Sequence, residues 1–174
     1  MKLSKKHRNS IAVFTGIFLF LLAVAGFLIP FRETIHYAVP ALIWSQEDRT
    51  ALAGAAFELN GHIDRFLFRK DTVSGTLTVM PDGAFPELTI PLEKEPCLRF
   101  LGGSLLSFGF YENGGVKTCN LWFGDDLQAF EVSSSVYGPQ IRVTAPARSM
   151  EDVNVVEEAL FLTHTSGSGA SVSS

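Results

Sequence analysis

The hydrophobic residues follow three patterns in succession along the chain, and the first is a continuous apolar block. From Ile11 to Ile29 there are 19 residues without a charge, and 13 of them are Leu, Ile, Val or Phe. At a rise of about 1.5 Å per residue, a helix of this length covers roughly the 30 Å apolar thickness of a bilayer. The block therefore predicts a transmembrane helix over residues 11–30, preceded by a short basic segment at residues 1–10.

The charges around this block predict its orientation. Lys2, Lys5, Lys6 and Arg8 precede it without any acidic residue, and flanking positive charge stays in the cytoplasm. We therefore expect a cytoplasmic N-terminus, an apolar block in contact with membrane lipid, and all later residues outside the cytoplasm. That exported part holds ten basic and 18 acidic residues, a formal charge of −8, which should repel nucleic acid and anionic lipid headgroups.

A cleaved secretory signal is the alternative interpretation of the block. Ala23 and Ala25 are separated by one residue, a small-residue spacing that signal peptidase accepts, and cleavage near Ala25 would release the domain. However, the apolar run continues through Phe27, Leu28 and Ile29, which a signal peptide does not need. The sequence therefore favours a retained signal anchor.

The second pattern is an alternation of apolar and polar residues between residues 55 and 145. Leu88, Ile90 and Leu92 are one example, and Gly, Pro, Asn and Asp separate the alternating stretches. Alternation of this kind is typical of antiparallel strands with one buried face. Residues 81–83 and 113–115 supply the turns of two hairpins. Seven or eight strands predict a mainly β fold, either an antiparallel β-sandwich, which we favour, or a small barrel.

The third pattern is a helical spacing near the end of the chain. Val153, Val156 and Leu160 recur at this spacing, and Ser149 precedes Asp152 as in a capping box. This predicts a short C-terminal helix, with a last strand over residues 153–162 as the alternative.

The remaining segments complete the expected organisation. Residues 31–54 mix apolar and charged residues around Pro40 and are expected to form a juxtamembrane stalk, because proline interrupts a helix. An extracytoplasmic β-rich domain then covers residues 55–163. Residues 164–174 are almost entirely Ser, Gly, Ala, Val and Thr, and we expect a disordered tail.

Cys97 and Cys119 are the only cysteines of the chain. Outside the cytoplasm a disulfide persists, so one bond between them is expected, worth about 3 kcal/mol. Two buried thiols are the alternative, because the alternation places Cys119 on the same face as Leu121 and Phe123. No second ligand lies at short spacing from either cysteine, and no zinc site is predicted.

Two aromatic residues are candidates for contacts with a partner. Trp122 lies out of phase with its apolar neighbours Leu121 and Phe123, so we expect it to face outward. One interpretation joins it with Tyr111 in an exposed aromatic patch, and packing in the core, as expected for most aromatic residues of the chain, is the alternative.

The sequence indicates binding more than chemistry. It contains no nucleophile elbow, phosphate-binding glycine loop or paired metal ligands, so we predict no catalytic, cofactor-binding or metal-binding residue and no enzyme activity. The expected function is an interaction module of the cell envelope that binds a protein or a surface polymer. The alternatives are a structural subunit of a membrane complex and an extracytoplasmic hydrolase, whose site would combine Glu58, His62, Asp64, Asp125 and Asp126.

Overall fold

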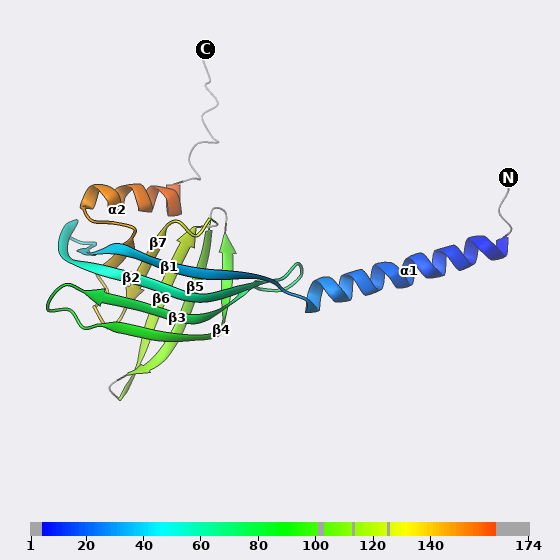
Figure 1. Cartoon of the computed structure of the whole chain (residues 1–174), viewed down its shortest axis with the longest axis horizontal. Coiled ribbons are helices and arrows are strands. Elements are labelled where there is room, and N and C mark those ends of the chain that lie inside the picture. Colours follow the sequence, from blue (N-terminus) through cyan, green and yellow to red (C-terminus); the bar gives the residue numbers. More distant parts are fainter. Residues whose placement is uncertain (1–4, 101–102, 113, 125, 163–174) are drawn as a thin grey trace, which may run out of the picture.

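The alternating region forms strands, which the computed structural model arranges between two helical segments (Figure 1). The structure describes residues 5–100, 103–112, 114–124 and 126–162, and among these it describes side chains from residue 13 onward, except those of residues 100, 112 and 162. The elements in chain order are α1 Lys5–Leu28, β1 Phe31–Ser45, β2 Thr50–Arg65, β3 Thr72–Pro81, β4 Leu88–Phe100, β5 Gly103–Glu112, β6 Gly115–Gly124, β7 Phe130–Ser134, β8 Ile141–Ala145, α2 Met150–Glu157 and the π-helical turn η1 Glu158–Leu162. The predicted tail at residues 164–174 lies outside the described residues.

The strands form one closed antiparallel barrel. Each strand pairs with the strand that follows it, and residues 42–45 of β1 pair with residues 141–144 of β8. The mainly β prediction is confirmed, and the architecture is the barrel rather than the sandwich that we favoured. A sandwich consists of two sheets, whereas the short ladder between β1 and β8 closes one continuous sheet into a barrel.

Alternate side chains fill the barrel. Phe57, Leu59 and Ile63 of β2 point inward and are buried. From the opposite part of the sheet Phe130 of β7 meets Phe57, with ring centroids 4.9 Å apart. An interior packed in this way supplies the apolar burial that stabilises a small barrel.

The two predicted hairpins are present. Residues 82–87 connect β3 to β4, and Gly114, with a φ of 80°, lies in the tight turn between β5 and β6. A positive φ of this size suits glycine, which has no Cβ to clash with the backbone.

β2 and β3 approach closely where Gly61 pairs with Gly75. A Cβ on Gly61 would lie only 2.0 Å from the Ser74 carbonyl oxygen. Gly75 has a φ of 146°, and a Cβ there would lie 2.1 Å from the Asn60 carbonyl oxygen. Both positions therefore require glycine.

The expected stalk is part of the barrel. Residues 31–45 form β1, residues 46–49 form a turn, and residues 50–54 begin β2. Ile35, Ala41 and Ile43 of β1 contribute to the core. Pro40 is compatible with this strand because it precedes residues 42–45, the part of β1 that pairs with β8. At Pro40 β1 has no ladder to β8, so proline occupies an edge position, where the missing N–H is tolerated. The stalk prediction was wrong because apolar residues on both faces of β1 obscure its alternation. Leu42 and Trp44 on the outer face are buried in a cluster with Val153 of the C-terminal helix.

The C-terminal helix packs on the outside of the barrel (Figure 1). Ser149 is its N-cap, and both bonds of the predicted capping box with Asp152 are present. Val153, Val156 and Leu160 are buried against the barrel wall. This confirms the predicted helix, which continues as η1.

Helix α1 extends away from the barrel at the start of β1 (Figure 1). Its apolar side chains are largely exposed, as at Phe14 with 73% and Leu28 with 60%. Over the part of the chain whose side chains are described, no helix is both long enough and apolar enough to cross a membrane.

Candidate functional site

The loop between β2 and β3, residues 66–71, touches the last turn of α1. Gly26 of α1 is buried beneath it, and a Cβ built on Gly26 would lie 2.8 Å from Phe68 Cε2 and 3.1 Å from Leu67 Cδ1. The missing side chain thus lets the loop pack directly on the helix. Leu67 and Phe68 nevertheless remain 63% exposed each, so the loop presents an apolar tip beside the end of α1.

Behind this tip lies an open cleft of about 570 Å³. The loop residues 66–71 form one side of the cleft, and Cys97, Leu98 and Arg99 of β4 form the other. Leu98 is half-exposed. The cleft therefore combines apolar surface with basic side chains.

Asp71 fixes the shape of the cleft. Its carboxylate, 3% exposed, accepts hydrogen bonds from the Phe66 backbone N–H at 2.9 Å and from Arg99 Nε at 2.7 Å. Its backbone carbonyl accepts a bond from the Cys97 N–H at 2.9 Å. A buried carboxylate is tolerated when its oxygens are satisfied in this way, and these bonds hold the loop against β4.

The cleft carries an excess of positive charge. The Arg69 guanidinium lies 3.5 Å from the centroid of the Phe66 ring, a cation–π contact. Within the described residues no ion pair involves Arg69 or Lys70, whereas Arg99 is paired with Asp71. Two uncompensated cations beside apolar surface can recognise a small anion that carries an apolar group.

A second cluster of polar groups lies where the C-terminal helix covers the barrel. Trp122, Glu131 and Thr144 are register partners across β6, β7 and β8. The Trp44 indole N–H donates to Thr144 Oγ1 at 2.9 Å. This row faces away from the barrel interior and toward α2 and η1.

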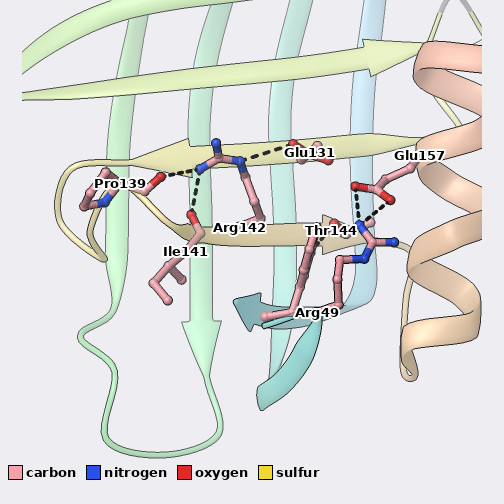
Figure 2. A network of polar contacts seen from close by, with 8 residues as sticks. Arg49, Glu131, Pro139, Ile141, Arg142, Thr144 and Glu157 are labelled. Atoms are coloured by element: carbon pink, nitrogen blue, oxygen red, sulfur yellow. Dashed lines mark hydrogen bonds and ion pairs between the residues drawn. The ribbon is translucent and has the colours of Figure 1, made fainter. Parts of the chain in front are cut away.

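Glu131 is the unusual member of this row, because it is only 6% exposed. Its Oε1 lies 3.6 Å from Arg142 Nε, and its Oε2 accepts no hydrogen bond from the described residues. Figure 2 shows Arg142 between Glu131 and the carbonyls of Pro139 and Ile141, to which Nη1 donates at 2.9 and 3.2 Å. Arg142 is thus shared between the carboxylate and the backbone.

Burial raises the pKa of Glu131 to about 7, and the nearby Glu157 adds to the rise. Arg142 and Arg49 oppose it. The charge of Glu131 therefore changes near neutral pH, beneath the C-terminal helix.

Arg49 links the turn after β1 to the C-terminal helix (Figure 2). Its Nη1 donates to Glu157 Oε2 at 2.9 Å, and its guanidinium lies 4.8 Å from the Trp44 ring centroid. Arg49 is 47% exposed at its side chain, and exposed ion pairs of this kind contribute little. The helix is therefore held mainly by its apolar contacts.

Cys97 and Cys119 are both free and buried in the structure, so the expected disulfide is not formed there. Cys97 pairs with Leu106 and Cys119 with Phe108, which places β5 between them. Adjacent strands are about 4.8 Å apart, and second neighbours exceed the roughly 7 Å that a disulfide spans between Cα atoms. Burial raises the pKa of each thiol to about 12.

The two aromatic candidates have different surroundings. Tyr111 on β5 is 75% exposed. Trp122 is half-buried, packs on Ala129, Val156 and Leu160, and makes an edge contact with Phe161 at 6.3 Å between ring centroids. They do not form one joint patch, because the C-terminal helix shields Trp122.

Three of the candidate hydrolase residues lie on the outward face of β2, where Asp64 is buried. Glu58, His62 and Asp64 occupy alternate outward positions of β2, and His62 Nε2 is 3.9 Å from Asp64 Oδ2. Asp64 receives two bonds from Arg32, at 2.8 and 3.0 Å, which lower its pKa. Asp126 accepts from the Gln128 N–H, and no described contact joins it to that group. Asp125 lies outside the described residues.

The cleft and Glu131 were both missed by the sequence analysis. The cleft had a signal, since Phe66, Leu67 and Phe68 are followed at once by Arg69 and Lys70, an apolar tip beside two cations. Nothing in the sequence indicated the burial of Glu131, because a single acidic residue between two apolar ones is typical of an exposed strand face.

These observations define the class of protein, an eight-stranded antiparallel barrel with an apolar N-terminal helix and an amphipathic cleft at the junction of the two. Comparisons with protein-family models, with curated proteins and with solved structures found no match to this chain. Its function is therefore inferred from its own residues.

Proposed function

We propose that the chain is a single-pass membrane protein whose barrel lies outside the cytoplasm and acts by binding. The observation that carries this proposal is the exposed apolar surface of α1, where Phe14, Phe18 and Phe20 are 73%, 61% and 68% exposed. A contiguous apolar surface of this kind needs a second apolar phase to cover it. The uncharged run of 19 residues has the length of a bilayer span.

Binding, rather than catalysis, agrees with the chemistry of the cleft. Among its described lining residues the Cys97 thiol has a pKa of about 12, so it is not an activated nucleophile. The Asp71 carboxylate is occupied by Arg99 and by a backbone N–H. The basic and apolar groups of the cleft support recognition, and the expected partner is a component of the cell envelope.

Membrane fractionation of cells that express the full chain with a C-terminal tag tests the proposal. The tag should remain with the membranes after alkaline carbonate extraction, and protease added to intact cells should remove it. A cytoplasmic control protein must survive the same treatment. Release of the tag from the membranes by carbonate would overturn the proposal. So would a tag that protease digests only after the cells are lysed, when the cytoplasmic control is digested as well.

The intact mass of the membrane-bound product separates anchoring from secretion. A retained anchor gives the mass of the full chain, whereas cleavage after Ala25 gives a product that begins at Gly26. A cleaved, soluble product would refute the single-pass anchor and establish the secreted alternative.

A further inference from the structure

We propose that the β2–β3 loop inserts into the leaflet that surrounds the end of α1, and that the cleft behind it binds the phosphate headgroup of an anionic phospholipid. This inference rests on the membrane insertion of α1 proposed above. It adds a second lipid contact and gives the cleft a ligand class.

The depth of the loop follows from its contact with α1. Leu67 and Phe68 lie against Gly26, which is three residues before Ile29, the end of the uncharged run. The helical bond from the Ile29 N–H to the Ala25 carbonyl, 2.8 Å long, continues α1 to this point. At about 1.5 Å per residue, the tip of the loop is roughly 4.5 Å inside the apolar edge of the bilayer if α1 spans it.

The side chains at this level suit the boundary between acyl chains and headgroups. Leu67, Phe68, Phe31 and Ile29 are 63%, 63%, 63% and 62% exposed. Apolar residues that insert beside basic ones are typical of interfacial membrane contacts. Arg69 and Lys70 directly follow the apolar tip, so they reach the headgroup level.

The local charge differs from the charge of the exported part as a whole. Its formal charge of −8 predicts repulsion of anionic lipid. At this end of the barrel, however, Arg32, Arg65 and Arg99 are paired with acidic residues, while Arg69 and Lys70 of the loop have no ion pair among the described residues. Residues 93–95 of β4, next to this end, add two carboxylates and one lysine, so the excess of positive charge is confined to the loop. Arg69 and Lys70 therefore attract anionic headgroups at this end of the barrel. The acidic residues elsewhere are repelled by the membrane surface, which orients the rest of the barrel away from it.

Insertion of the loop is tested with the full chain reconstituted in vesicles of phosphatidylcholine and phosphatidylglycerol. An environment-sensitive fluorophore on Leu67→Cys should be quenched by lipids that carry a spin label near the headgroup. The same fluorophore on Leu52→Cys, which is 45% exposed at the start of β2, is the matched control and should not be quenched. The two native thiols are buried and should not take the label.

Headgroup binding is tested by titrating fluorescent phosphatidylglycerol into the full chain in detergent. Each basic residue at an anionic surface contributes about a factor of five in affinity, so Arg69→Gln combined with Lys70→Gln should weaken binding roughly 25-fold. The control removes the same charge elsewhere, with Lys117→Gln and Arg148→Gln, and should change the affinity less than about twofold. Free inorganic phosphate should not displace the lipid.

The contrary outcomes distinguish the insertion of α1, the insertion of the loop and the headgroup site from one another. Failure of the reconstituted chain to float with the vesicles would refute the insertion of α1, and with it the proposed function. A floating chain whose Leu67 and Leu52 labels are quenched equally would refute the loop insertion alone. Equal weakening by both double variants, equal affinity for phosphatidylcholine, or displacement by inorganic phosphate would refute the headgroup site.

Discussion

Glu131 is a carboxyl group enclosed between the barrel wall and the C-terminal helix. One of its oxygens faces Arg142, which is itself occupied by two backbone carbonyls, and the other accepts no described hydrogen bond. A buried carboxylate with so little compensation is more stable when it is neutral. Its protonation should therefore be linked to the stability of the fold.

We predict that this linkage appears between pH 5 and pH 8. Folding raises the pKa of Glu131 from 4.5 to about 7, so the folded state holds the proton more tightly. The resulting stabilisation is complete below pH 4.5 and is lost as the pH rises through 7, for a total of about 3 kcal/mol. Glu131→Gln should remove this loss, as measured by urea unfolding at pH 5 and pH 8.

The exposed Glu93→Gln provides the control for this experiment, and it should keep the wild-type dependence on pH. If Glu131→Gln also keeps that dependence, Glu131 does not titrate in this range.

The two cysteines give a second prediction at the residue scale. Burial raises the pKa of both thiols to about 12, and only the thiolate reacts quickly with alkylating reagents. The folded chain should therefore take up no iodoacetamide at pH 8, and the denatured chain should take up two equivalents without a reductant, as counted by mass spectrometry. The Leu67→Cys variant without a fluorophore serves as the reactive control, and a denatured wild-type chain that takes up none would establish a disulfide.

At the scale of elements, the crossing of β2 and β3 depends on two glycines. We predict that Gly75→Ala destabilises the barrel by about 3 kcal/mol or more, because it adds a Cβ in a strained backbone conformation against a neighbouring strand. Gly83→Ala is the matched control, since a Cβ there meets nothing within 4 Å. Its effect on the unfolding midpoint should be small, and equal effects of the two substitutions would contradict the close crossing.

At the scale of the whole molecule, α1 and the barrel are nearly independent. Among the residues whose side chains are described, none of α1 belongs to the buried clusters, and the described contact is that of Gly26 with the β2–β3 loop. We predict that deletion of residues 1–28 changes the thermal unfolding midpoint of the barrel by only a few degrees, about the effect of 1 kcal/mol or less. Near-ultraviolet circular dichroism would measure it, and loss of the cooperative transition would show that the barrel needs α1.

Much of the local structure could be predicted from single segments. The capping box of Ser149 and Asp152, the glycine turn at Gly114 and the alternation of Leu88, Ile90 and Leu92 each act over a few residues, and all three agree with the structure. Interactions within one turn or one strand depend on neighbouring residues, which the sequence displays directly.

The candidate sites could not be predicted from single segments. The cleft joins residues 66–71 to β4, and the burial of Glu131 requires β6, β8 and the C-terminal helix around β7. Phe66 and Phe68 are two residues apart, a spacing that places side chains on one face of a strand. They nevertheless lie in a loop beyond β2, where Phe66 is buried and Phe68 is exposed. Their positions depend on Asp71 and α1, which the local pattern does not reveal.

By itself, then, the sequence determined the alternation of strands such as β4, the turns of two hairpins and the start of the C-terminal helix, because short-range sterics and hydrogen bonds decide these features. Only the tertiary structure decided that β1 closes on β8, that Cys97 and Cys119 stand on opposite sides of β5, and that Glu131 is buried. These outcomes depend on strand register and on packing between residues far apart in the chain, where many pairings satisfy the same local pattern.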